Sequence, residues 1–255
     1  MITDLLSLLA GAAGIFLVKD HGGFRWAVFI GLFLAGACWF GCYHYTRLWN
    51  KRFRVKPIHQ ALCGIAALIT LVFSLLYPAL AYVRDAAEAS VTVWEAQIRH
   101  DGVWAAGTFR EAYYAVRKLG IEDFRGIPEP GAPRSWIPTA HDKSRQEAAA
   151  IYASSACAHF ASNRPFLSKV VWARPRVPAE VVFADVHRWH QTNPNYPPER
   201  AISLAAEQIR TGLVAQAPRL VSTMRFVAII LFLLAQALPF GLVGWAAYRD
   251  IKVKV

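Results

Sequence analysis

The chain has 255 residues, 55% of them hydrophobic, and a formal net charge of +11. Soluble domains are usually about 45–50% apolar, and the apolar excess lies at the two ends of this chain, which excludes one large soluble core. Residues 84–222 hold 17 basic and 14 acidic side chains, so most of the positive charge belongs to the flanking segments. This distribution disfavours a nucleic-acid-binding surface on the polar middle, and no nucleic-acid partner is expected.

The first apolar stretch, residues 5–18, lies between Asp4 and Lys19. It is at the short limit for a transmembrane helix, which takes about 20 residues. No basic segment precedes it, as one does in a secretory signal peptide. The stretch either crosses the bilayer as a short helix or lies in the interface. We expect it to cross, because its small residues, from Ala10 to Gly14, allow close packing on a neighbouring helix.

Three further stretches, residues 24–43, 59–83 and 224–248, are long enough to cross a membrane as helices. Their only Asp, Glu, Lys or Arg residues are Arg25 and Arg225, each near the start of its stretch. Ion-coupled transport generally needs ionisable side chains at depth. The sequence therefore disfavours a transporter or channel made by this chain alone.

Lys and Arg gather in the loop 44–58 and in the tail after residue 248. Short basic loops stay in the cytoplasm, and their charges attract anionic lipid headgroups. The side chains expected to set the topology and contact lipid are Arg47, Lys51, Arg52, Arg54, Lys56, Arg249, Lys252 and Lys254. We therefore expect a multi-pass protein of a bacterial inner membrane, with residues 84–222 in the periplasm.

The polar middle has no stretch that alternates convincingly as a strand does. Its expected helices cover residues 84–100, 103–119, 142–162, 179–191 and 199–216, with a short helix or strand over 165–175. Prolines predict an extended loop over 126–142. Thr139 and Asp142 have capping-box spacing. Pro178 suits a first helical position, and Pro218 predicts a kink before the last span.

These elements predict an all-α integral membrane protein with four transmembrane helices, or three if residues 5–18 do not cross. A mainly helical extracytoplasmic domain is inserted before the last span. We expect an N-terminal membrane region over residues 1–83 and a helical periplasmic domain over 84–222. A last span with a short basic cytoplasmic tail follows over 223–255.

The sequence "DVHRWH" suggests a metal site, because His187 and His190 share one face of a helix. With Asp185 or His159 they could bind zinc. Histidines at the surface or at an interface are the favoured interpretation, because the HEXXH pattern is absent and a third ligand is unassigned. We expect no metal, no other cofactor and no catalytic residue; a membrane metalloenzyme is the alternative.

Two further sets of residues have more than one interpretation. Cys157 and His159 could form a thiol nucleophile with its base, but two residues apart on a helix they point in different directions. Aromatic residues of the middle region could be core or could contact a partner protein. They are Trp94, Trp104, Trp136, Trp172 and Trp189.

The leading functional hypothesis is a non-enzymatic inner-membrane subunit of a multiprotein envelope complex, bound to other membrane or envelope proteins or to copies of itself. In layout, and in "GLVGWAAYRDIKVKV" at residues 241–255, the chain resembles small inner-membrane proteins carried by conjugative elements. That resemblance implies a secretion or conjugative-transfer apparatus. The alternative hypothesis is a membrane sensor or regulator whose periplasmic domain binds a ligand or partner.

Overall fold

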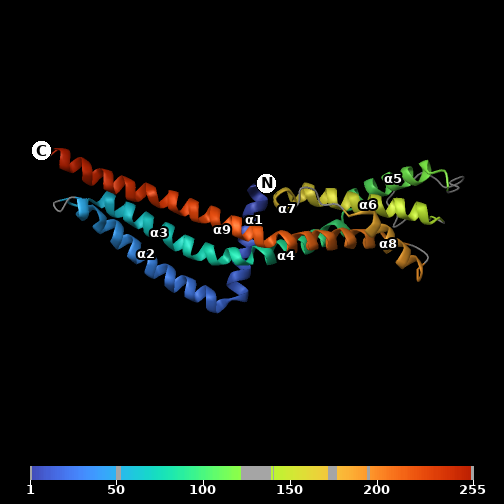
Figure 1. The fold of residues 1–255 in the computed structure, drawn as a ribbon, viewed down its shortest axis with the longest axis horizontal. Coiled ribbons are helices and arrows are strands. Elements are labelled where there is room, and N and C mark those ends of the chain that lie inside the picture. The colour runs from blue at the N-terminus through green and yellow to red at the C-terminus, as the bar shows by residue number, and fades with distance from the viewer. Residues whose placement is uncertain are drawn as a thin grey trace. The chain divides into compact units, whose positions relative to one another are not determined.

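The computed structural model describes residues 2–49, 53–121, 139, 141–171, 177–193 and 196–253, and over these residues it is all-helical, without a strand (Figure 1). The helices in chain order are α1 (Ile2–Lys19), α2 (His21–Trp49), α3 (Pro57–Ala79), the 3-10 turn η1 (Leu80–Tyr82), α4 (Val83–Arg99), α5 (Gly102–Lys118), α6 (Asp142–Asn163), α7 (Pro165–Val171), α8 (Ala179–His190) and α9 (Pro198–Val253). The predicted all-α class is confirmed.

Four helical segments are long and apolar enough to cross a membrane, which indicates a membrane protein. They are Ile2–Lys19, His21–Tyr45, Pro57–Arg99 and Pro198–Asp250. Each contains one of the apolar stretches recognised in the sequence. The last two continue well beyond those stretches, because α3, η1 and α4 follow one another directly and α9 is a single helix of 56 residues.

The chain divides into two compact units. Unit 1 comprises Met1–Leu8 and Ala87–Ala217, and unit 2 comprises Leu9–Ala86 and Pro218–Val255. Each boundary falls inside a helix, so α1, α4 and α9 each run from one unit into the other. The boundary in α9 directly precedes Pro218, where the sequence predicts a kink and α9 continues as a helix.

Unit 2 is built on the antiparallel pair α2 and α3, against which α9 packs. Gly31 of α2 lies close to Leu71 and Ser74 of α3, and farther along the pair Cys42 packs with Cys63 and with Val243 of α9. Gln236 of α9 donates from its amide nitrogen to the Ala66 carbonyl at 2.9 Å and to Thr70 Oγ1 at 2.8 Å. Polar side chains therefore join the helices within the apolar region.

The basic loop is shorter than predicted, because α2 continues to Trp49 and includes Arg47. Arg54 and Lys56 lie in the connection before α3. Lys252 lies in α9, where Arg249 also stacks on Trp245, with 5.6 Å from its guanidinium carbon to the ring centroid. Lys51, Arg52 and Lys254 lie outside the described residues.

Unit 1 has a core between α5, α6, α8 and the start of α9. The buried residues of this core are Phe109, Ala112, Tyr113, Val116, Ala148, Ala149, Tyr152, Ala153, Val182, Val186, Tyr196 and Ala201. Alanines dominate the share from α6, and their small side chains allow neighbouring helices to approach closely. The aromatic rings from α5 and α6 fill the remaining volume.

Helix ends in unit 1 follow local signals, with two corrections. Gly120 follows α5 with φ of +64°, the left-handed conformation expected of a helix-ending glycine. The predicted capping box is wrong: His141 is the N-cap residue of α6, and the buried Thr139 hydroxyl has no hydrogen-bond partner among the described residues. Pro178 is the N-cap of α8, one position before the predicted place. Residues 165–171 form a helix and no strand.

Two glycines of α2 test the close packing of unit 2. A Cβ atom at Gly31 would lie 3.0 Å from Ser74 Cβ, whereas one at Gly36 would meet nothing within 4 Å. We predict that Gly31→Leu lowers the free energy of unfolding by about 1–3 kcal/mol, because overpacking forces α2 and α3 apart. Gly36→Leu, the matched control, should stay near wild type. Thermal unfolding in detergent measures both; equal melting temperatures would contradict the prediction.

Candidate functional site

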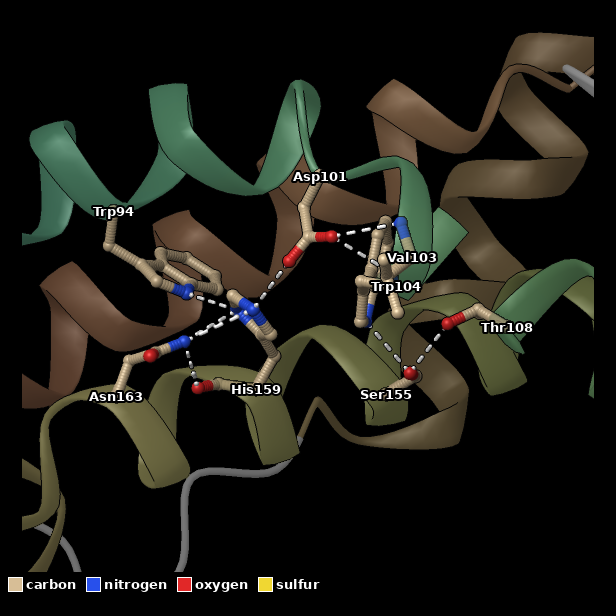
Figure 2. Close-up of polar contacts among 8 residues, drawn as sticks. All are labelled: Trp94, Asp101, Val103, Trp104, Thr108, Ser155, His159 and Asn163. Atoms are coloured by element: carbon tan, nitrogen blue, oxygen red, sulfur yellow. Dashed lines mark hydrogen bonds and ion pairs between the residues drawn. The ribbon is translucent and has the colours of Figure 1, made fainter. Parts of the chain in front are cut away.

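A polar group in unit 1 centres on His159 of α6 (Figure 2). The Trp94 indole nitrogen, on α4, donates to His159 Nδ1 at 3.0 Å. Asp101, between α4 and α5, places Oδ2 at 3.3 Å from His159 Nε2. The Asn163 amide nitrogen donates to the His159 carbonyl oxygen at 3.1 Å. One imidazole thus connects α6 to α4 and to the start of α5.

These contacts involve both nitrogens of the ring. An indole N–H can only donate, so His159 Nδ1 is the acceptor in the contact with Trp94. Nε2 faces the Asp101 carboxylate. Both ring nitrogens are occupied by contacts within unit 1, as in a histidine that orients helices.

Asp101 also caps α5. Its Oδ1 accepts from the backbone N–H groups of Val103 and Trp104, both at 3.0 Å. The backbone hydrogen bond from Trp104, against a smaller opposing effect of burial, holds the pKa of the Asp101 carboxyl below its ordinary value; those from Val103 and His159 add to it. A negative charge at a helix N-terminus is favoured by the helix dipole as well.

A second branch of the group joins α5 to α6 through Ser155. The Trp104 indole N–H donates to Ser155 Oγ at 2.9 Å, and Thr108 Oγ1 lies 2.8 Å from the same oxygen. An aspartate, a histidine and a serine therefore occur together, as in a nucleophilic triad. However, Ser155 Oγ contacts Trp104 and Thr108, whereas the His159 ring contacts Trp94, Asp101 and Asn163. These contacts hold α5 and α6 together and do not activate the Ser155 hydroxyl.

A second polar group connects α8 to α9 through Asp185, which is only 7% exposed. Arg200 forms two parallel contacts, Nη2 to Oδ1 at 2.6 Å and Nε to Oδ2 at 3.0 Å, and the Tyr196 hydroxyl donates to Oδ2 at 2.8 Å. The guanidinium also lies over the Trp189 ring at 5.3 Å. Burial raises the pKa of the Asp185 carboxyl, but the hydrogen bonds from Arg200 and Tyr196 outweigh it, so the pKa is lowered.

The structure does not bring the four metal-ligand candidates together. Asp185 is occupied by Arg200 and Tyr196, and His159 belongs to the separate group around Trp94. His190 Nε2 accepts from Arg145 at 2.7 Å, while its Nδ1 faces the Asn193 carbonyl at 3.1 Å. His187 is exposed. Within the described ranges no three His, Cys, Asp or Glu side chains form a group that could hold a metal ion.

Cys157 has the environment of a core thiol. It is buried on α6, and burial raises the pKa of the thiol to about 11. At neutral pH the thiol therefore stays protonated, whereas a nucleophilic cysteine needs a lowered pKa. The interpretation of Cys157 with His159 as nucleophile and base has no support in this geometry.

The tryptophans proposed as partner contacts divide into two groups. Trp94 is 0% exposed and packs edge-on against Phe160, with centroids 5.1 Å apart, so it is a core residue and no partner contact. Trp104 and Trp189 are partly buried against the core of unit 1 and keep some exposed surface. Trp136 and Trp172 lie outside the described residues.

An ion-pair group that was not predicted from the sequence lies between α4 and the unit 1 part of α9. Glu95 receives Arg99 Nη2 at 2.6 Å on Oε1 and Arg210 Nη2 at 2.7 Å on Oε2. Arg99 also donates to Ser203 Oγ at 2.8 Å. Glu95 and Arg99 have the i, i+4 spacing of a helical ion pair, and Ser203 and Arg210 lie seven apart on α9. These spacings were available in the sequence; the pairing of the two helices was not.

No protein-family model, curated protein or solved structure matches this chain.

Two substitutions at Asp101 separate its capping role from its contact with His159. Asp101→Ala removes both, and loss of an N-cap side chain costs about 0.5–2 kcal/mol. Asp101→Asn retains a capping oxygen, so we expect it to lose less than half as much. Thermal unfolding followed by tryptophan fluorescence measures both. Equal losses of stability in the two variants would show that the capping hydrogen bonds of Asp101 contribute nothing beyond its negative charge.

The lowered pKa of Asp185 predicts a loss of stability in acid. As pH falls, the Asp185 carboxyl takes up a proton in the unfolded chain before it does so in the folded chain. Its contribution to the stability of the fold is therefore complete above about pH 4. It is lost as pH falls through the lowered folded-state pKa. At pH 7 we expect Asp185→Asn to cost about 2 kcal/mol, because a charge-assisted pair is broken.

Asp142→Asn is the matched control, since that carboxylate is 61% exposed in its pair with Arg145. It should change stability at pH 7 by less than about 1 kcal/mol. The difference between wild type and Asp185→Asn should shrink below pH 4. A difference that stays constant down to pH 2 would contradict the assigned role of the carboxylate.

Proposed function

We propose that this chain is a non-enzymatic inner-membrane subunit of a multiprotein envelope complex, with unit 1 as its extracytoplasmic helical domain. The observation that carries the proposal is helical continuity. Besides α1, two helical connections lead from unit 2 to unit 1: one runs through α3, η1 and α4, and the other is the uninterrupted α9. A domain joined at both ends by continuous helices to apolar segments is suited to be the membrane-anchored part of an assembly.

The ion pairs between α4 and α9 support the same role. The side chains of Glu95, Arg99, Ser203 and Arg210 join α4 to the unit 1 part of α9. Because both helices also continue into unit 2, we propose that this tie makes α4 and α9 act as one mechanical element. A subunit that transmits force or position within an assembly needs such an element.

The placement of unit 1 outside the cytoplasm rests on the basic residues of the α2–α3 connection and of the C-terminal end. Arg54, Lys56 and Arg249 are among the described members of that set. Lys and Arg near the ends of spans favour the cytoplasmic side. A bacterial inner membrane and a secretion or conjugative-transfer apparatus are the setting that this layout suggests.

A sensor or regulator is the second candidate, and the α4–α9 tie also favours it. A ligand that bound unit 1 and changed the contacts of Glu95 would reach both connecting helices at once. The two candidate functions predict different compositions for the purified protein. A scaffold subunit is found with other envelope proteins, whereas a sensor can function as a monomer or dimer with a bound ligand.

The deciding experiment is extraction from native membranes in a mild detergent, followed by mass measurement of the particle and mass spectrometry of its proteins. We expect a stoichiometric assembly with other envelope proteins. Weakening the tie with Arg210→Ala should loosen that assembly, whereas Arg110→Ala, on an exposed position of α5, is the control. A lone monomer or homodimer in wild type would overturn the proposal and favour the sensor.

A further inference from the structure

The two packed helices α2 and α3 define which chain segments share one side of the membrane. Gly31 lies beside Ser74 and Cys42 beside Cys63, so the helices are antiparallel. If both cross the bilayer, the start of α2 at His21 and the end of α3 at Ala79 are on the same side. Residues 87–197 follow on that side, because no described helix between α4 and α9 is a candidate span.

The C-terminal end of α1 is held at that same end of the α2–α3 pair. Lys19 Nζ contacts Asp85 Oδ2 at 2.9 Å, and the Tyr82 hydroxyl donates to Asp20 Oδ2 at 3.2 Å. Phe16 packs on the Tyr82 ring with centroids 5.6 Å apart. These contacts all lie within unit 2, and they place residues 16–20 beside the junction of α3 and α4.

The N-terminal end of α1 is held by unit 1. Asp4 is 7% exposed; its Oδ1 lies 3.6 Å from Arg164 Nη1, and its Oδ2 accepts from the backbone N–H of Phe166 at 3.0 Å. Arg164 and Phe166 belong to the segment that follows α3 without an intervening span. Asp4 is therefore on the side of the membrane that also holds Lys19.

We infer that α1 does not cross the bilayer and lies along the membrane surface on the side of unit 1, with its exposed apolar face against lipid. A helix of 18 residues is about 27 Å long, enough to cross a hydrocarbon core of about 30 Å, so length does not separate the two arrangements. The contacts at the two ends of α1 separate the two arrangements, since a crossing helix has its ends on opposite sides of the membrane.

The pattern of burial along α1 identifies the lipid-facing surface. The covered face consists of Asp4, Leu8, Ala12 and Phe16, spaced by four residues. The exposed large hydrophobic residues are Ile2, Leu6, Leu17 and Val18. Helices at a membrane surface bury their apolar face at the boundary between headgroups and acyl chains. Because α1 leads through Asp20 directly into α2, lipid is the occupant that lies next to this face.

The inference leaves three membrane spans in place of four, formed by α2, α3 and α9. The placement of α1 on the side of unit 1 does not rest on the proposed function; only the expectation that this side is the outer side of a spheroplast does. It also predicts that the two ends of the chain are on opposite sides, with residue 2 on the side of unit 1 and residue 253 on the other.

Labelling with a membrane-impermeant maleimide tests the side of each segment. The single substitutions Thr3→Cys, Arg110→Cys and Arg54→Cys introduce exposed thiols in α1, in unit 1 and in the α2–α3 connection. Wild type is the blank, since Cys42, Cys63 and Cys157 are buried and Cys38 is partly buried. In sealed spheroplasts we expect Thr3→Cys to label with Arg110→Cys, and Arg54→Cys to label only after the membrane is opened. Labelling of Thr3→Cys only together with Arg54→Cys would overturn the inference.

If Thr3→Cys is labelled from neither side, spin-label depth decides. Labels at Leu6→Cys, Ala10→Cys and Leu17→Cys, in a Cys38→Ser background, should all report the shallow depth of the headgroup region. Phe33→Cys on α2, whose native side chain is 72% exposed, supplies the deep reference. A deep label at Ala10 between two shallow ones would mean that α1 crosses. Three labels fully in water would overturn the contact with lipid.

Discussion

The Glu95 carboxylate, shared by two arginines, is the interaction on which the pairing of α4 with the unit 1 part of α9 is built. Arg99 comes from its own helix and Arg210 from α9. Exposed ion pairs usually contribute less than about 1 kcal/mol each, but Glu95 is largely covered and the two arginines share it. Because α4 and α9 both continue into unit 2, this contact joins two of the three helices that run from one unit into the other.

The two other polar groups of unit 1 lie between pairs of neighbouring helices. His159 connects α6 to the corner between α4 and α5, and Asp185 connects α8 to α9. Buried polar groups are costly when unpaired and specify geometry when paired. Each group has one acidic residue whose partners come from another segment, so their arrangement selects one packing among the many that an alanine-rich helix such as α6 allows.

Sequence reasoning recovered what local chemistry determines. Long apolar runs predicted the candidate spans, and the helix predicted over residues 103–119 agrees with α5 to within one residue at each end. Predictions from local sequence patterns were wrong or left open where contacts with other segments determine the structure. The Thr139 capping box has the right spacing, but His141 begins α6 in its place. Trp94 could be core or surface until Phe160 and His159 were placed beside it. Asp4 bounds an apolar stretch in the sequence, and only the fold shows its partners Arg164 and Phe166.

The composition of the unit 1 core has a consequence for biosynthesis. Tyr196 and Ala201 belong to the same buried cluster as Phe109 and Tyr152. During synthesis the earlier helices emerge before these two residues exist, so the cluster cannot close until the chain has been made into the start of α9. The apolar part of α9 follows directly. Unit 1 therefore completes its fold at about the moment when the last hydrophobic segment reaches the insertion machinery, and a delay in either process would leave aromatic surface exposed to aggregation.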